Sequence, residues 1–367
     1  IAVSVLLVAC PCAFAIATPT AVTAGISNMA RRGILVKGGS YIEEAGKIDT
    51  LLVDKTGTFT IGSPSVMDIV GFNGVSKQEV IYLAAIGEKY SEHPLARAII
   101  KHAKEQGVEI PEPEEFKAEI GKGVIARFNE KDLIVGKEEL LEDKGIMLDE
   151  TIKAHMTIQR EKGRTAMLVA RDSQVIGLIS IADKVRAGVK DVILLLRKIG
   201  IKNITMLTGD NAVTAQTVAE EIGVDDFKAN MLPEQKQQVV EEMQKQGKKV
   251  AMIGDGINDA PALAMADIGM AMGATGTDIA IETADISLMN DDLSSVADFI
   301  WTSKAVYKRI KINMFLSIIY NVIGLILASM GMLSPVGAVI FQEAGCISVV
   351  ISSTLLLRYK PRYPKIN

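Results

Sequence analysis

The sequence predicts an α/β protein built on a doubly wound parallel sheet, with a second domain inserted into that sheet and transmembrane helices on either side of it. Three observations support this prediction. Uncharged apolar stretches lie near both ends of the 367-residue chain. In the interior, short apolar runs followed by polar loops alternate with helical patterns, an order typical of parallel sheets with a site at the carboxyl edge. Between residues 64 and 172 this alternation of apolar runs and helical patterns changes, which indicates an inserted α+β domain.

The composition narrows the function classes. The chain has 40 Lys and Arg against 44 Asp and Glu, a formal net charge of -4, so no nucleic-acid partner is expected. Its 3 Cys cannot build a disulfide scaffold and fit a reducing compartment for the soluble part. Hydrophobic residues make up 49% of a chain that is also 23% charged. The apolar excess must therefore be concentrated, and it lies at the two ends.

Both ends predict membrane spans and the lipid bilayer as a partner. Ile1–Ala30 contains no charged residue, and Met314–Gln342 and Ala344–Leu357 are uncharged on either side of Glu343. About 20 such residues cross a bilayer as a helix. With a turn near residues 331–335, the second region forms two spans. Basic residues flank the spans and predict that these flanks are cytoplasmic, with the plasma membrane as the expected location: Arg31, Arg32, Lys304, Lys308, Arg309, Lys311, Arg358 and Lys360.

The first thirty residues could instead be a signal peptide, since such peptides are apolar and end in small residues. This stretch has no basic leader and carries prolines in Cys10-Pro11-Cys12 and Thr18-Pro19-Thr20. Prolines at membrane depth need a structural reason. We therefore expect a fragment that begins inside a membrane helix of a longer protein.

The expected domains follow from these patterns. They are a membrane helix, the first part of the sheet domain, the inserted domain, the second part of the sheet domain, two membrane helices and a cytoplasmic tail, at residues 1–30, 31–63, 64–172, 173–300, 301–357 and 358–367. Four apolar runs are expected as strands, at residues 50–53, 166–170, 204–207 and 250–253.

Three of these strands end in polar motifs. Asp54-Lys55-Thr56-Gly57-Thr58 follows the first, so a carboxylate would stand at the strand tip, where it can act as a nucleophile and form an acyl phosphate. Thr208-Gly209-Asp210 ends another and offers a hydroxyl donor. Lys236, early in a helical pattern, could neutralise phosphoryl oxygens. Each motif alone is common in turns at strand ends, and their joint occurrence is more specific.

The third motif follows the last of these strands and places Asp255 and Asp259 four residues apart. Hard carboxylate oxygens on a glycine-rich loop are what Mg²⁺ requires beside a phosphate. This loop also contains Asn258.

At these motifs the chain resembles the P-type ATPases, and the resemblance covers nearly its whole length. Residues 54–60 match the family's phosphorylation motif, with Phe59 in a variable position. The resemblance implies a haloacid-dehalogenase-like phosphorylation domain in which ATP phosphorylates Asp54. It also implies that Thr208 and Lys236 hold the phosphate, and that Asp255, the Asp54 carboxylate and the Thr56 backbone hold Mg²⁺, in a loop shaped by Asn258 and Asp259.

One residue separates this reading from a soluble phosphatase. Phosphatases of the same superfamily carry an acid two residues after the nucleophile, where it serves as general acid and base. This position is Thr56 here, so the phosphoenzyme is expected to persist. Persistence suits a transport cycle, in which the stored bond drives a conformational change.

The inserted segment resembles the nucleotide-binding domain of heavy-metal P-type ATPases. It contains Ser91-Glu92-His93-Pro94 and Gly121-Lys122-Gly123, which are similar to that family's His-Pro and Gly-x-Gly elements for adenine and phosphates. Glu88 resembles the acidic residue near the adenine, and Gly136-Lys137 resembles a Gly-Asn element with Lys in place of Asn. A simple helix start, with Ser91 as its cap, is the alternative reading of the His-Pro motif.

The first span carries a pattern for a transported ion. Proline in Cys10-Pro11-Cys12 removes a backbone donor and exposes carbonyls beside two thiols, and soft sulfur ligands select Cu⁺, Zn²⁺ or related ions. The motif resembles the transition-metal branch of the family. The polar candidates in the last span are Gln342, Glu343, Cys346, Ser352 and Ser353, of which Glu343 and Cys346 are the expected ligands. Tyr320-Asn321 resembles an element found in copper exporters. The Met and Ser pair of copper exporters and the Asp of zinc exporters are not in register, so the metal stays open.

Three functions follow. The leading one is ATP-driven export of a soft transition-metal cation of the Cu⁺ or Zn²⁺ type, with ATP and Mg²⁺ as cofactors; the parent chain would supply upstream helices and an actuator domain. A membrane-anchored phosphohydrolase would hydrolyse rapidly and need no metal besides Mg²⁺. A membrane metal sensor that only binds nucleotide would be unaffected by Asp54→Asn.

Overall fold

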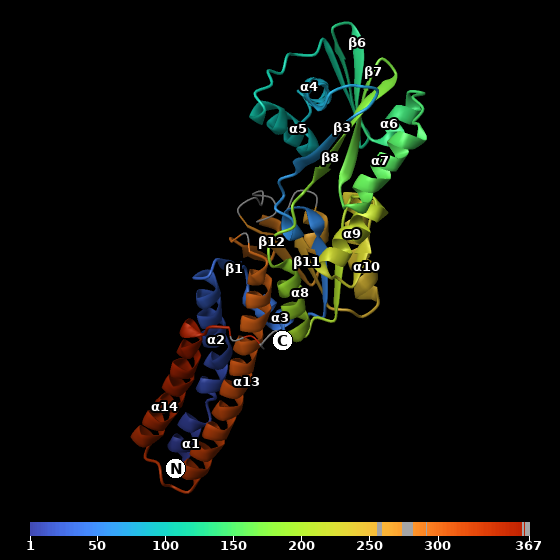
Figure 1. The fold of residues 1–367 in the computed structure, drawn as a ribbon. Helices are drawn as coiled ribbons and strands as arrows, with labels where there is room; N and C mark the ends of the chain where they lie inside the picture. The colour runs from blue at the N-terminus through green and yellow to red at the C-terminus, as the bar shows by residue number, and fades with distance from the viewer. Residues whose placement is uncertain (255–258, 274–281, 291, 362, 364–367) are drawn as a thin grey trace. The chain divides into compact units, whose positions relative to one another are not determined.

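The computed structural model describes residues 1–254, 259–273, 282–290, 292–361 and 363. It contains two β-sheets with their covering helices and a group of long apolar helices (Figure 1). Contacts divide the chain into two compact units. The first comprises Ile1–Val53, Lys190–Ile204 and Pro233–Asn367, and the second comprises Asp54–Val189 and Thr205–Leu232.

The larger sheet has seven strands in the order β1-β13-β12-β11-β2-β9-β10. Strand β11 pairs in parallel with β2 and β12, β12 with β13, and β9 with β10, whereas β1 is antiparallel to β13. These strands are β1 (Ile34–Val36), β2 (Thr50–Asp54), β9 (Asn203–Leu207), β10 (Asp226–Lys228), β11 (Val250–Gly254), β12 (Ile268–Met272) and β13 (Ile286–Leu288). β2, β11 and β12 are buried at every residue, as parallel strands covered on both faces must be. The predicted parallel sheet is confirmed.

Helices connect these strands in the alternating order that the sequence predicts. They are α3 (Gly39–Ala45), α8 (Val189–Lys198), α9 (Ala212–Ile222), α10 (Pro233–Lys245) and α11 (Ala260–Met265). Helix α9 shows why such helices begin and end where they do. The Asn211 side chain accepts a hydrogen bond from the Thr214 amide, and Gly223 ends the helix in the left-handed conformation.

The second sheet lies wholly in the second unit and is antiparallel, with the order β3-β8-β7-β6-β5-β4. Its strands are β3 (Ser65–Gly71), β4 (Glu115–Glu119), β5 (Gly123–Phe128), β6 (Lys131–Gly136), β7 (Thr165–Arg171) and β8 (Gln174–Ala182). Its helices are α4 (Lys77–Gly87), α5 (Pro94–Glu105), α6 (Glu138–Asp143) and α7 (Glu150–Glu161). Met167 and Val169 pack with α4 and α5, whereas Leu168 and Ala170 pack with α6 and α7, so the helices cover opposite faces (Figure 1).

Strand β8 lies beyond the expected domain boundary between residues 172 and 173, yet it belongs to the sheet that was expected to end there. It pairs with β3 and β7 of the antiparallel sheet, so this sheet extends to Ala182 rather than ending at residue 172. The reason is that β7 and β8 form a hairpin whose turn contains Asp172 and Ser173, both with positive φ. An apolar run in the sequence does not reveal which of two neighbouring sheets it joins.

Three helical segments are long and apolar enough to cross a membrane: Ala2–Ala30, Ser294–Ser329 and Pro335–Arg358. The first is broken into α1 (Ala2–Val8) and α2 (Cys12–Ala30) at Pro11, which has no backbone N–H to donate, whereas Pro19 lies inside α2 without ending that helix. The other two are α13 (Ser294–Ser329) and α14 (Pro335–Thr354), which a 3-10 turn continues at Leu355–Arg358. Helix α2 packs against both α13 and α14 (Figure 1). The expected turn near residues 331–335 separates α13 from α14.

Candidate functional site

The phosphorylation motif forms a tight turn at the end of β2. The strand delivers Asp54 as a largely buried carboxylate, 6% exposed. The next residues, Lys55–Phe59, turn sharply because Gly57 adopts φ +75°, a conformation that side-chain-bearing residues rarely take. The turn therefore fixes the direction of the carboxylate at the strand tip, as the sequence predicts.

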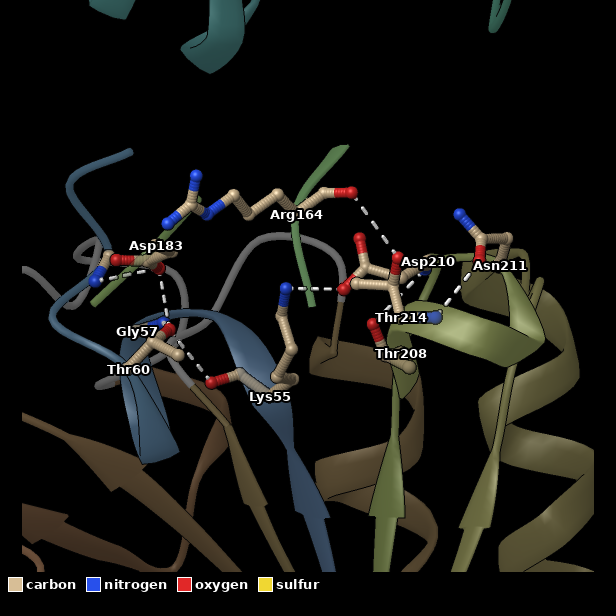
Figure 2. Close-up of polar contacts among 10 residues, drawn as sticks. Lys55, Gly57, Thr60, Arg164, Asp183, Thr208, Asp210, Asn211 and Thr214 are labelled. Carbon is tan, nitrogen blue, oxygen red and sulfur yellow. Dashed lines mark hydrogen bonds and ion pairs between the residues drawn. The ribbon is translucent and has the colours of Figure 1, made fainter. Parts of the chain in front are cut away.

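Two residues that the sequence analysis missed hold this turn. The Arg186 guanidinium donates through Nε to the carbonyl oxygens of Thr58 and Thr60, at 3.0 and 2.9 Å, and through Nη2 to that of Gly57, at 2.9 Å. Asp183 accepts from the Thr60 hydroxyl at 2.5 Å (Figure 2). The Asp183 carboxylate also accepts from two backbone amides just after the turn, at residues 62 and 63. Both side chains follow β8, and an acidic and a basic residue directly after a long apolar run was the available signal.

The Thr208 motif meets the phosphorylation motif through an ion pair. Lys55 Nζ contacts the Asp210 carboxylate, with side chains only 12% and 20% exposed (Figure 2). Thr208 is buried, and its hydroxyl oxygen accepts from the Asp210 amide at 3.1 Å, which leaves its hydroxyl hydrogen able to donate. The end of β10 holds this loop, because the Thr208 amide donates to the Lys228 carbonyl at 3.0 Å. The predicted convergence of these two strand-end motifs is present in the second unit.

Lys236 and Asp259 form a buried pair in the first unit. Their Nζ and Oδ1 atoms lie 2.6 Å apart, and the residues are 6% and 0% exposed. Asp259 Oδ2 is buried and accepts no hydrogen bond within the described ranges. It lies against Gly254, where an added Cβ would come within 2.4 Å of it. The predicted Mg²⁺ ligand Asp255 and its neighbour Asn258 lie outside the described residues.

In the inserted domain, Glu88 is a buried carboxyl group at the end of α4. It is 3% exposed. Burial raises the pKa of Glu88 from 4.5 to about 7, against the opposing effect of a hydrogen bond with Ser91. The group therefore changes its charge near neutral pH.

His93, rather than Ser91, caps α5. Its Nδ1 accepts a hydrogen bond from the Leu95 amide at 3.2 Å, and Pro94 occupies the first helical position. Burial and, to a lesser extent, the positive charge of Lys137 lower the pKa of His93. The imidazole is therefore neutral at pH 7 and keeps its Nε2–H free of the cap interaction. Glu92, the neighbouring candidate, is exposed.

The glycine candidates differ from one another. Gly121 has φ +76° and no atom within 4 Å of where a Cβ would stand, so its surface is open to a ligand. Gly123 instead packs on strand β6, because a Cβ there would come within 2.5 Å of the Gly136 Cα. The Lys137 amide donates to the Lys122 carbonyl at 2.8 Å. The glycine turn thus adjoins the residue whose charge acts on His93.

The helix break at Pro11 lies between two amide side chains. Asn321 donates to the carbonyl oxygens of Val8 and Cys10, at 3.0 and 3.3 Å. Gln342 Nε2 contacts the same Cys10 carbonyl. The exposed carbonyls that proline creates are thus satisfied by α13 and α14.

The Cys10 and Cys12 thiols are free and face each other, with Sγ atoms 2.6 Å apart. Cys346 packs against a buried cluster formed by Ala13, Ala17 and Val349, whereas Glu343 is exposed. In the part of the chain that the structure describes, no three His, Cys, Asp or Glu side chains form a metal-binding group. The predicted ion ligands Cys10, Cys12, Glu343 and Cys346 therefore stay a prediction.

Comparison with known proteins places the chain in a family. Residues 48–267 match the family model of haloacid dehalogenase-like hydrolases. The chain is 43% identical to the zinc-exporting P-type ATPase of Mycobacterium marinum and the manganese-exporting P-type ATPase of Mycobacterium leprae, covering 98% and 97% of this chain and 49% of each relative. It is also 43% identical to the copper-exporting P-type ATPase of Staphylococcus aureus, over 98% of this chain and 44% of that relative. The chain thus spans about half the length of the curated relatives it matches.

Solved structures show the same similarity to P-type ATPases. A zinc-transporting PIB-type ATPase in the E2.Pi state has a TM-score of 0.79 and 36% identity, over 97% of this chain and 57% of that chain. The catalytic domain of the CPx-ATPase CopB-B has a TM-score of 0.60 and 33% identity, over 75% of this chain and 98% of that one. With a haloacid dehalogenase-like sheet, the predicted phosphorylation motif at the tip of one of its strands and three helices long and apolar enough to cross a membrane, the chain belongs to the P-type ATPases.

Proposed function

We propose that the protein containing this chain exports a transition-metal cation across a membrane, driven by ATP through an aspartyl phosphate on Asp54. One observation supports this most directly. The Asp54 carboxylate stands at the tip of β2, on a turn joined to the Thr208 loop by the pair of Lys55 and Asp210. This is the arrangement that a nucleophilic carboxylate and a phosphate-binding hydroxyl require.

The proposed chemical step is phosphoryl transfer from ATP to Asp54. A carboxylate oxygen of Asp54 attacks the γ-phosphorus of ATP, the bond to the bridging oxygen breaks, and ADP leaves with that electron pair. Thr208 donates its hydroxyl hydrogen to a phosphoryl oxygen, and Lys236 supplies positive charge. Because Thr56 cannot transfer protons as an acid does, the acyl phosphate outlasts the departure of ADP.

Mg²⁺ is the cofactor that this chemistry implies. When bound, it neutralises charge on the transferred phosphoryl group. The residues proposed to hold it are Asp54, the Thr56 backbone and Asp255. The donor chemistry fits a hard cation, because Asp259 Oδ2 is a buried carboxylate oxygen without a hydrogen-bond donor within the described ranges.

ATP is proposed to bind the inserted domain at Glu88, His93 and the Gly121 turn. A neutral His93 with a free Nε2–H can donate to a nucleotide, and the open Gly121 turn allows its backbone to approach one. Glu92, which is exposed as His93 is, stays a further candidate, and Gly123 is the less direct one because it packs on β6.

The ionisation of Glu88 gives a pH prediction. Its folded-state pKa of about 7 lies above the ordinary 4.5, so the folded domain binds the proton more tightly than the unfolded chain does. The stability from this group is complete below pH 4.5 and is lost as the pH rises through 7. Between pH 5 and 8 the free energy of opening the domain is expected to fall by about 2 kcal/mol.

Amide hydrogen exchange of α4 in the whole chain, corrected for intrinsic rates, measures this effect. Glu88→Gln should remove the pH dependence, whereas Glu105→Gln, on the exposed surface of α5, should retain it. Equal protection of the wild type at both pH values would show that the Glu88 carboxyl is solvated.

The cation is proposed to bind at Cys10 and Cys12, with Glu343 and Cys346 completing its ligands. Thiols favour Cu⁺, whereas a carboxylate favours a divalent ion such as Zn²⁺, so Glu343 is the residue that distinguishes them. The basic residues flanking the three apolar segments support a cytoplasmic position for the soluble parts and a plasma-membrane location.

Phosphorylation by ATP tests the proposal in the full-length protein. Acid-stable, hydroxylamine-sensitive phosphate should form in response to one of Cu⁺, Zn²⁺, Mn²⁺, Cd²⁺ or Co²⁺, and Cys10→Ala should abolish that response. Loss of only the divalent response in Glu343→Ala would assign a divalent cargo. If no metal elicits a phosphoenzyme, the transport proposal fails, and rapid metal-independent hydrolysis would favour a phosphohydrolase.

A further inference from the structure

A buried polar cluster joins the three membrane helices away from the cysteines. It consists of Thr20 on α2, Asn313 on α13, and Ser352 and Ser353 on α14. Asn313 Nδ2 donates to Ser353 Oγ at 3.0 Å, and Ser352 Oγ donates to Asn313 Oδ1 at 2.7 Å. The Thr20 and Ser353 hydroxyl oxygens lie 3.0 Å apart. Asn313 and Ser353 are each 1% exposed, whereas Thr20 and Ser352 are half-buried, so the centre of the cluster lies in the interior of the helix group.

The cluster uses its hydrogen-bonding groups internally. Both functional atoms of the Asn313 amide are bonded to α14, and the Thr20 hydroxyl also donates to the Ile16 carbonyl at 2.7 Å. The Arg309 guanidinium donates to Ser352 Oγ at 3.2 Å, placing a positive group at the cluster. A neighbouring guanidinium repels a cation, so this arrangement suits helix contact rather than ion binding. Polar groups in an apolar bundle are tolerated where they bond one another across helices.

The cluster shares a helix face with the thiol site. On α14, Gln342, Cys346, Val349 and Ser353 follow one another at intervals of four, three and four residues, which places them on one stripe. Gln342 contacts the Cys10 carbonyl at the helix break, and Ser353 lies beside Thr20. The stripe is thus fixed to the first membrane helix at both ends, with Cys346 between them.

The fixed points are well separated along the helices. Asn313 and Asn321 are eight residues apart on α13, which is about 12 Å at the rise of an α-helix. Asn321 binds the carbonyls at the break, and Asn313 binds the serines. On α14 itself, Gln342 contacts the Cys10 carbonyl at the break, whereas Ser352 and Ser353 bond with Asn313. These two contacts determine both the rotation and the axial position of α14, and therefore where Cys346 lies along α2.

We propose that Asn313 is a positioning residue for the metal site: its hydrogen bonds to Ser352 and Ser353 fix the register of α14 against α2 and hold Cys346 level with Cys12. This inference rests on the proposed function for its consequence in transport. The register itself is a property of the helices and can be measured without transport.

Thiol cross-linking in the full-length protein, in membranes, measures the register. In a Cys10→Ser background, a short bifunctional thiol reagent should join Cys12 and Cys346. Asn313→Ala should slow this reaction about three- to twentyfold, the range expected for hydrogen bonds between membrane helices. Ser317→Ala is the matched control, because Ser317 is also buried on α13 but donates only to the Asn313 carbonyl of its own helix.

A second measurement separates positioning from general damage. With Cys10 intact, Asn313→Ala should raise the metal concentration for half-maximal phosphorylation of Asp54 by a similar factor and leave the half-saturating ATP concentration unchanged. Unchanged cross-linking in Asn313→Ala, or equal slowing in Ser317→Ala, would overturn the inference even in a working transporter. Absence of any metal-dependent phosphoenzyme in the wild type would instead overturn the proposed function, while the cross-linking rates would still decide the register.

Discussion

Replacing Asp54 with Asn is expected to abolish phosphorylation by ATP, with a loss on the order of 10³-fold or more. An amide cannot form the acyl phosphate, while its size and shape fit the same buried position at the end of β2. ATP binding should be retained within about twofold, because Glu88 and His93 lie in the inserted domain and are unchanged. Radioactive phosphate incorporation and equilibrium nucleotide binding, both in the full-length protein, measure the two properties.

Asp172→Asn is the matched control for this prediction. Asp172 lies in the exposed turn between β7 and β8, where its carboxylate accepts from the Asp132 amide at 3.2 Å and from no other donor among the described residues. The same chemical change there should leave phosphorylation intact. Wild-type levels of phosphate on Asp54→Asn would show that another residue accepts the phosphoryl group.

Arg186→Lys is expected to slow phosphorylation by roughly 10²-fold without removing the nucleophile. Arg186 donates to three carbonyl oxygens of the turn that follows Asp54. A lysine ammonium cannot reproduce this planar, forked geometry. The turn would shift, and misplacement of a reacting group by about 1 Å is sufficient for a loss of that size. Single-turnover phosphorylation at saturating ATP and metal measures the chemical step.

Arg171→Lys provides the comparison for that variant. Arg171 forms an ion pair with Glu79 at 2.8 Å, at a partly exposed position away from the turn. Exposed pairs of this kind contribute little, so the rate should change by less than about twofold. An Arg186→Lys variant with a wild-type rate would show that the turn keeps its shape without the guanidinium.

The core of the sheet could be predicted because its strands are simple patterns. Thr50–Asp54 and Val250–Gly254 are short apolar runs that end in a carboxylate or glycine motif, and both form buried parallel strands. The three candidate membrane spans were equally predictable, since each helix contains an apolar stretch long enough to cross a bilayer. The assignment of β8 was not, because its apolar run fits either sheet.

The site was predictable to a different degree in each part. Lys55 and Asp210, from two of the strand-end motifs, form an ion pair, and the Asp210 amide donates to the Thr208 hydroxyl oxygen. The catalytic roles of these residues and of Asp54 stay predictions. The roles of Lys236 and Asp259 stay predictions, although their buried ion pair is a new observation. Asp183 and Arg186 were missed because they contact the turn from 120 to 130 residues away in the sequence. The acidic and the basic residue after β8 could be noticed locally, but their partner in the turn could not.

By itself, the sequence determined the chemistry available to this protein: a carboxylate on a sharp turn, two thiols beside a proline, and apolar segments of membrane length. These features depend on residue type and local spacing, so they can be read along the chain. Only the tertiary structure decided which groups support them. Arg186 holds the turn, Asn321 and Gln342 bind the carbonyls freed at Pro11, and Asn313 joins α13 to α14. The physical reason is that hydrogen bonds depend on distance in space, and folding brings these donors and acceptors together from distant parts of the chain.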